Sequence, residues 1–138
     1  VKVGSKFLLT VRVKDPSLRD SNDPRFTEAF PLGVTFNEYQ GAATVAFTRH
    51  PDNVVDTPSE KLNEPVSLCQ GCTMQAKPDG PNVVSVPGPE GLAQVYASFS
   101  EPGSYVIHAR VDNFAAPDST QNNQCCWTNV FQKITVTP

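Results

Sequence analysis

Apolar and polar residues alternate in several short stretches of this sequence, and this alternation constrains the fold more than any other feature. In KFLLTVRVK, the odd-numbered residues from Phe7 to Val13 are apolar, and most of the even-numbered ones are polar. Successive side chains of a strand point to opposite faces of a sheet, so this pattern predicts a strand with one buried face. The same period of two recurs in residues 31–39, 42–48, 92–99, 104–111 and 130–137, and two shorter stretches, 65–69 and 82–86, fit it less fully.

Turn residues separate these stretches, and no long segment repeats with the period of a helix. Pro102 and Gly103 have the order that a type II turn requires, and Gly41 stands where two strands would reverse direction. Six to eight short strands with frequent turns predict an antiparallel β-sandwich. We expect a single domain over residues 1–138, with long loops near residues 49–65 and 77–90.

Composition excludes two classes of partner. The net charge is −3 and no basic cluster is present, so a nucleic-acid interface is not expected. No apolar run approaches the roughly 20 residues that a membrane helix needs, so membrane insertion is not expected either. The first residues lead directly into a predicted strand without the pattern of a signal peptide, and we expect a mature protein or a module cut from a larger one.

The segment ASFSEPGSYVIHARVDN carries the clearest resemblance to a known family. It resembles the last hairpin but one of immunoglobulin-like and PKD-like extracellular modules, in which a Pro-Gly-x-Tyr turn leads into a strand that ends in Asp. Tyr105 stands where that family often has its corner tyrosine. Ile107 stands where antibody-type domains have a core cysteine, so the inter-sheet disulfide is missing. The resemblance implies an immunoglobulin-like antiparallel β-sandwich of about seven or eight strands.

The run Cys-Cys-Trp-Thr-Asn before the last predicted strand resembles a set of secreted bacterial proteins with no assigned activity. This second resemblance implies an exported protein, extracellular or periplasmic, and carries no catalytic residue across. A shared sandwich is by itself no evidence of shared function.

Four cysteines form two tight pairs, Cys69 with Cys72 and Cys125 with Cys126. An even count in a chain rich in Asn, Thr, Ser and Pro predicts disulfides and export. Bridges between the pairs would close loops of more than 50 residues, and one such bridge would stabilise by about 4 kcal/mol, whereas two local bridges remain the alternative. A four-thiolate zinc site is less favoured, because adjacent cysteines rarely bind one ion without strain.

Acidic residues follow two of the predicted strands. In the sandwich topology, strands 6–14 and 104–112 end at the same pole, and their oxygen atoms could together form a calcium site. The alternative is that Asp and Asn serve as turn residues whose side chains bond the nearby backbone. The candidate metal ligands are Asp15, Asp20, Asp23, Asp112 and Asp118.

Trp127 has two interpretations: it covers the end of the core beside a disulfide, or it lies exposed with Phe114 as a stacking platform. The candidate ligand contacts are Phe114, Asn122, Asn123 and Trp127. We expect no enzyme, because no GxSxG elbow is present and neither His50 nor His108 lies in a catalytic motif.

These observations predict a non-catalytic extracellular binding or structural module: a surface adhesion domain, a spacer or an accessory domain of a larger secreted protein. Loops 15–30 and 112–127 are the expected contact surface, and the edge strands offer a second route. The expected partners are protein or carbohydrate at the cell surface, or neighbouring copies of the chain. A metal-binding module and, less favoured, a secreted enzyme remain the alternatives. No cofactor is expected apart from the candidate calcium.

Overall fold

The computed structural model of the chain describes residues 1–26, 30–53, 80–116 and 127–138. These residues form an all-β fold with one short 3-10 helix, Pro24–Phe26. The strands are β1 (Phe7–Lys14), β2 (Leu32–Gln40), β3 (Val45–Arg49), β4 (Val83–Val86), β5 (Glu90–Phe99), β6 (Gly103–Asp112) and β7 (Trp127–Val136). The strand predicted at residues 65–69 lies outside the described residues.

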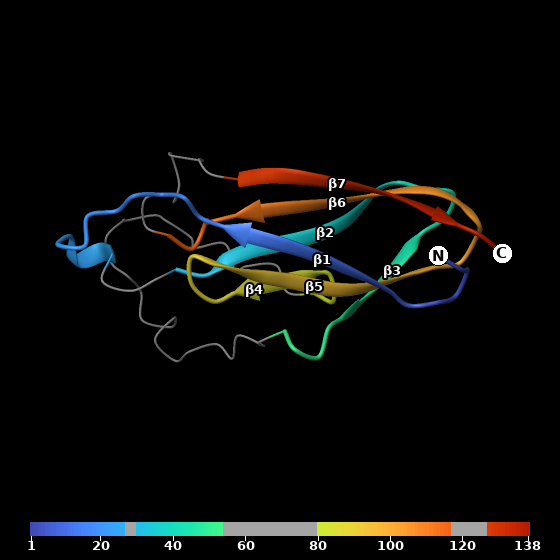
Figure 1. The fold of residues 1–138 in the computed structure, drawn as a ribbon, viewed down its shortest axis with the longest axis horizontal. Helices are drawn as coiled ribbons and strands as arrows, with labels where there is room; N and C mark the ends of the chain where they lie inside the picture. The colour runs from blue at the N-terminus through green and yellow to red at the C-terminus, as the bar shows by residue number, and fades with distance from the viewer. Residues whose placement is uncertain (27–29, 54–79, 117–126) are drawn as a thin grey trace, which may run out of the picture.

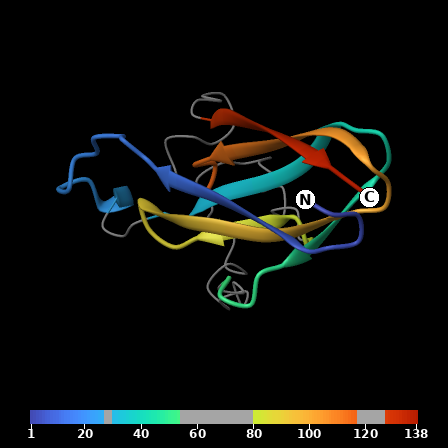
Figure 2. The ribbon, with the colours of Figure 1, turned by 45° about the vertical axis from the view of Figure 1, so that its right-hand side comes forward.

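The seven described strands form two sheets, in the orders β1-β5-β3 and β4-β2-β6-β7. Every pairing between named strands is antiparallel. Figures 1 and 2 show the two sheets as two layers, with the N-terminus and the C-terminus at the same end. The predicted antiparallel β-sandwich is therefore confirmed.

The core lies between the layers and uses the apolar faces that the period of two predicts. In β5 and β6 every second side chain is buried, beginning at Ala93 and Tyr105. These side chains meet those of β1 and β2 in one cluster, as expected when two sheets bury one face each. The largest fully buried side chains are Tyr105, Phe36, Phe99, Ile107, Val34 and Val95.

Strand β7 departs from the prediction along most of its length. Residues 127–133 are all exposed, and only Ile134 and Val136 are buried. Val130 lies on the predicted inward face but is 43% exposed. The reason is topological: β7 is the outer strand of a four-stranded sheet, and the described strands of the opposite sheet number only three.

The chain termini pair with each other at the C-terminal end of β7. Lys2 and Thr137 form a parallel bridge, in which the Val3 amide donates to the Thr137 carbonyl at 2.9 Å. The Thr137 amide donates in turn to the Val1 carbonyl at 2.8 Å. This pairing covers the last residues of β7 and leaves residues 127–133 outside it.

Strands β1 and β6 lie in different sheets and end at the same pole, as expected from the sequence (Figure 1). If β1 and β6 are matched to strands B and F of an immunoglobulin domain, β3 takes the place of strand D and β4 that of C′. However, β3 precedes β4 in the chain, whereas immunoglobulin variable domains have C′ before D. The immunoglobulin-like topology is thus not confirmed.

Tyr105 forms the corner predicted from the Pro-Gly-x-Tyr turn. Its side chain is 1% exposed, and its hydroxyl donates a hydrogen bond to the Glu101 carbonyl at 2.8 Å. The ring also explains Gly41, because a Cβ at position 41 would collide with the Tyr105 ring. Gly41 is therefore needed for close packing against the corner.

Replacing Tyr105 with phenylalanine should lower the free energy of unfolding by about 1 kcal/mol, because the part-buried hydrogen bond to the Glu101 carbonyl is lost while the ring is kept. Chemical denaturation would measure the change. Tyr39→Phe is the control, since Tyr39 is 67% exposed and should shift the midpoint very little. Equal effects of the two variants would contradict a stabilising role for the corner.

None of the helices in the described residues has the length and apolar character needed to cross a membrane.

Candidate functional site

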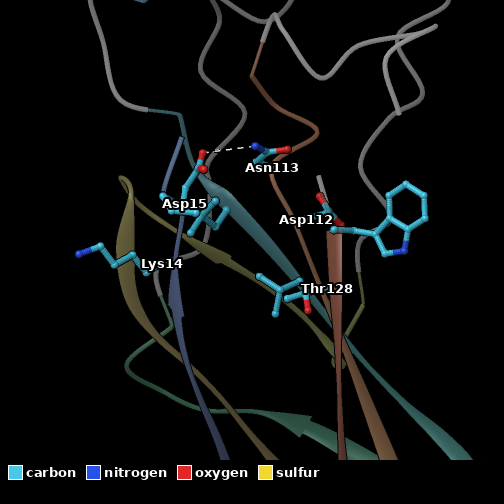
Figure 3. A pocket seen from close by; sticks show the side chains of 9 residues that line it. Lys14, Asp15, Asp112, Asn113 and Thr128 are labelled. Carbon is cyan, nitrogen blue, oxygen red and sulfur yellow. Dashed lines mark hydrogen bonds between the residues drawn. The ribbon is translucent and has the colours of Figure 1, made fainter. Parts of the chain in front are cut away.

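The pole where β1 and β6 end brings together residues that are far apart in the sequence. Asp15 follows β1 directly, and Asn113 follows β6. The Asn113 side-chain amide donates to Oδ2 of Asp15 at 3.3 Å, a bond that spans 98 positions of the chain. Figure 3 shows this bond at the mouth of a cavity. The expectation that Asp15 and the start of the segment after β6 lie at one pole is thus confirmed, whereas residues 27–29 and 117–126 of the two loops lie outside the described residues.

Asp15 accepts hydrogen bonds from three different residues at this pole, Ser17, Arg19 and Asn113. Its Oδ1 accepts hydrogen bonds from the Ser17 amide at 3.0 Å and the Ser17 hydroxyl at 2.5 Å. Its Oδ2 accepts one from Nη1 of Arg19 at 2.9 Å. Burial by itself would raise the pKa of Asp15, but the bonds from Ser17, Arg19 and Asn113 outweigh it and lower the pKa to about 2. Asp15 is therefore a structural anion that ties two loops together.

Three further acids of the predicted metal site bond locally. Asp20, Asp23 and Asp112 each accept the backbone amide of the residue two positions later, at 2.9, 3.0 and 3.3 Å. This is the Asx-turn geometry that makes aspartate a common turn residue. Hydrogen bonds from the Arg25 side chain and backbone also lower the pKa of Asp23.

No three His, Cys, Asp or Glu side chains gather into a metal-binding group within residues 1–26, 30–53, 80–116 and 127–138. The predicted calcium ligands Asp15, Asp20, Asp23 and Asp112 thus do not form such a group, although Asp20 and Asp23 belong to one turn, in which the Asp23 amide donates to the Asp20 carbonyl at 3.1 Å. Asp118 lies outside the described residues, as do Asn122, Asn123 and all four cysteines.

Asp112 owes its position to the glycine opposite it. Gly33 of β2 pairs in register with Asp112 of β6. A Cβ at position 33 would lie 2.8 Å from Oδ1 of Asp112, so only glycine leaves room for the carboxylate. Oδ2 of Asp112 lies 3.4 Å from Nη2 of Arg110 on the outer face of the sheet.

An open cavity of about 140 Å³ lies at this pole between the end of β1 and the start of β7. Leu32, Val111 and Thr128 contribute to its walls, while Asp15 and Asn113 stand at its mouth (Figure 3). Lys14 also lines it, but its ammonium lies 3.7 Å from Glu90 Oε2 on the neighbouring strand. The lining residues pair no nucleophile with a base, so the cavity has the character of an apolar recess with a polar rim.

Trp127 lies at the edge of this cavity and contacts Phe114. The two ring centroids are 6.2 Å apart with the planes at 67°. Trp127 is 49% exposed and Phe114 39%, so Trp127 does not cover the end of the core. The guanidinium of Arg110 lies over the Phe114 ring, with Cζ 5.7 Å from the centroid. Both rings are exposed, as in the second interpretation, but they meet edge to face and do not form a flat stacking platform.

A second group of rings, two of them exposed and one half-buried, was not predicted from the sequence. Tyr39, His108 and Phe131 stand on the outer face of β2, β6 and β7, and we call them the aromatic patch. Phe131 is stacked with His108, with centroids 5.0 Å apart, and meets Tyr39 edge-on at 5.1 Å. Nε2 of His108 also lies 2.7 Å from Oδ1 of Asn129. Only the register of three strands, which the sequence does not show, brings these rings together.

Comparisons of this chain with family models, with curated proteins and with solved structures found no match.

Proposed function

We propose that this chain is a non-catalytic extracellular binding module that recognises a protein partner through the outer face of the β4-β2-β6-β7 sheet. The observation that carries the proposal is the aromatic patch. Tyr39 is 67% exposed and Phe131 53%, although both are large rings in contact with each other. Aromatic side chains that lie exposed and close together on a rigid sheet are typical of the residues that contribute most of the binding energy at protein interfaces.

The ring geometry favours a protein over a carbohydrate partner. A flat platform for successive sugars of a chain would need coplanar ring faces, whereas Tyr39 lies at 73° to Phe131 and at 62° to His108. One face of Phe131 is already stacked on His108 at 26°. The patch therefore presents a compact apolar surface with ring edges, which suits an apolar side chain of a partner.

The state of the ionisable groups supports a role without catalysis. The acids of the pole are held by Asx turns and by Arg19 or Arg25. His108 lies among aromatic rings and bonds Asn129. The Ser17 hydroxyl does bond Asp15 at the mouth of the cavity, but the pKa of Asp15 is lowered to about 2, so this carboxylate is too weak a base to activate a hydroxyl near neutral pH.

We propose that this protein-binding surface belongs to an exported adhesion domain or accessory domain. The corner tyrosine supports the resemblance to immunoglobulin-like and PKD-like modules, because Tyr105 bonds the backbone four residues upstream. The two-layer scaffold would then hold the patch rigid, which lowers the entropy lost on binding.

Selection from a random peptide-display library tests this proposal, with a glycan array as the alternative probe. We expect peptides that bind the native chain and lose at least tenfold in affinity when Phe131→Ser is introduced. Leu92→Ser is the matched control, because Leu92 is 50% exposed on β5 of the other sheet and should leave affinity unchanged.

Two outcomes would overturn the proposal. One is specific binding to glycans with no selected peptide, which would assign the patch to carbohydrate. The other is a set of peptides that bind the Phe131→Ser variant as tightly as the native chain.

A further inference from the structure

The outer face of the β1-β5-β3 sheet is rich in positive charge. Every second residue from Lys6 to Lys14 points away from the core, because the residues between them face it. These five outward residues are all exposed, and three of them are cations: Lys6, Arg12 and Lys14. The described strands β1, β5 and β3 contain a single acid, Glu90, although the whole chain has a net charge of −3. The positive charge is therefore concentrated on this face.

Neighbouring acids do not neutralise these cations. The Lys14 ammonium lies 3.7 Å from Glu90 Oε2, but the two side chains are 72% and 67% exposed, so solvent weakens the pair. Within the described residues, neither Lys6 nor Arg12 forms an ion pair with an acid. Nζ of Lys6 lies over the ring of Tyr96 instead, 5.7 Å from its centroid. An anionic partner that reaches this face can therefore bind these charges without first displacing an acid from Lys6 or Arg12.

Two exposed leucines lie among the cations. Leu8 is 41% exposed on β1, and Leu92 is 50% exposed on β5. In the register of the two strands, Leu92 stands opposite Arg12 and Leu8 stands opposite Tyr96. Residues that stand opposite each other in an antiparallel pair point to the same face, so apolar and cationic side chains share one surface. We call this surface the basic face, and its members are Lys6, Leu8, Arg12, Lys14 and Leu92.

We propose that the basic face adsorbs to an anionic lipid membrane, with its cations on the lipid phosphates and its leucines at the boundary between headgroups and acyl chains. Lys and Arg suit this position, because their aliphatic stems lie along apolar surface while their charged ends reach the headgroups. Interfacial binding of this kind combines buried apolar area with attraction to anionic lipids, and it needs no membrane-spanning helix.

The composition of the basic face selects a membrane as its partner. Protein interfaces are depleted in Lys, and Leu is under-represented among the residues that contribute most of their binding energy. A soluble polyanion would bind the cations and leave Leu8 and Leu92 in water. Cations on the outermost strand of a sheet also prevent pairing with other chains, but that role does not explain the leucines beside them. A bilayer with anionic headgroups above an apolar interior accepts both kinds of side chain.

This inference goes beyond the proposed function, because it concerns the other sheet of the sandwich. The outer faces of two packed sheets point in opposite directions. A chain adsorbed through the basic face would therefore present the aromatic patch away from the membrane, where a protein partner can reach it.

Sedimentation of the native chain with lipid vesicles tests the basic face. We expect binding at low salt to phosphatidylcholine vesicles that contain about 30% phosphatidylglycerol, and at least tenfold weaker binding to pure phosphatidylcholine. Binding should also fall steeply at about 0.5 M salt, which screens exposed charges. Lys6→Gln and Arg12→Gln should each weaken binding about fivefold. Lys133→Gln is the matched control, because it removes an exposed cation from β7 of the other sheet and should leave binding unchanged.

A variant that combines Leu8→Ser with Leu92→Ser distinguishes a bilayer from a soluble polyanion. We expect it to bind the anionic vesicles at least tenfold more weakly than the native chain, because the apolar contribution is lost. Its binding to dextran sulfate, a polyanion without an apolar layer, should equal that of the native chain. Both leucines are exposed, so the melting temperature of the variant should stay close to the native value.

The inference is wrong if the native chain does not bind the anionic vesicles at low salt, or if Lys133→Gln weakens binding as much as Arg12→Gln. It is also wrong if the double leucine variant binds the vesicles as tightly as the native chain, since the cations alone then account for binding and the face suits any polyanion. None of these results bears on peptides that depend on Phe131, so the proposed function and this inference can fail separately.

Discussion

Replacement of Phe36 by alanine should lower the free energy of unfolding by about 3–5 kcal/mol. Phe36 is 1% exposed and lies in β2, at the centre of the core between the sheets. It stands opposite Ala109 of β6, a side chain too small to fill the space that the ring would leave. The loss combines the missing apolar burial with the cavity that remains.

Tyr39→Ala provides the matched control for Phe36→Ala. Tyr39 follows on the same strand but is 67% exposed, on the outer face. Urea denaturation at neutral pH should show less than about 1 kcal/mol of loss for the control. Comparable losses in the two variants would contradict the assignment of the inner and outer faces of β2.

Replacement of Asp15 by asparagine should lower the free energy of unfolding by about 2 kcal/mol at pH 7. The pKa of Asp15 falls from 3.8 to about 2 on folding, and each pKa unit corresponds to about 1.4 kcal/mol. The side chain is 7% exposed, so solvent screens its bonds to Ser17, Arg19 and Asn113 only weakly. Asparagine keeps the size of the side chain and removes its charge.

The pH dependence of this effect follows from the direction of the shift. A carboxylate whose pKa is depressed in the folded state stabilises above its unfolded pKa, and the contribution is lost as the pH falls through the folded value. The difference between the native chain and Asp15→Asn should therefore shrink from about pH 4 and largely vanish near pH 2. Thermal denaturation at a series of pH values would measure it.

Asp23→Asn is the control for the charge at this pole. Asp23 also has a lowered pKa, through hydrogen bonds from Arg25, but it lies in an exposed loop. We expect a much smaller loss of stability than for Asp15→Asn. If the native chain and Asp15→Asn differ equally at pH 2 and pH 7, the ionised state of Asp15 does not contribute to stability.

The arrangement at the pole could be predicted in part from the sequence. The meeting of Asp15 with the segment after β6 followed from the direction of two strands in a sandwich, and the bond to Asn113 confirms it. The sequence did not predict which acid would bond across two loops and which acids would only bond within local turns. In the sequence, an aspartate that binds a cation cannot be distinguished from one that accepts a backbone amide, as Asp112 does from Phe114. Both roles need only a positively charged or partly positive group near the carboxylate.

The aromatic patch could not be predicted at all. Tyr39 and Phe131 are more than 90 positions apart, and they meet only because β2 and β7 both flank β6. Their rings are exposed on the outer face of the sheet, and an outward residue of a strand can be polar or apolar. A local pattern therefore gives no sign of which outward rings become neighbours.

The sequence by itself determined which face of each strand is apolar, since alternation is a local property that the pleat of a strand converts directly into two sides. It also determined the corner at Tyr105, because the turn and the tyrosine lie within a few residues of each other. Only the tertiary structure decided which of those apolar faces is covered. Val130 alternates as a core residue should, yet it stays 43% exposed. Burial needs a second layer above the side chain, and the number and order of strands in that layer depend on contacts between distant segments.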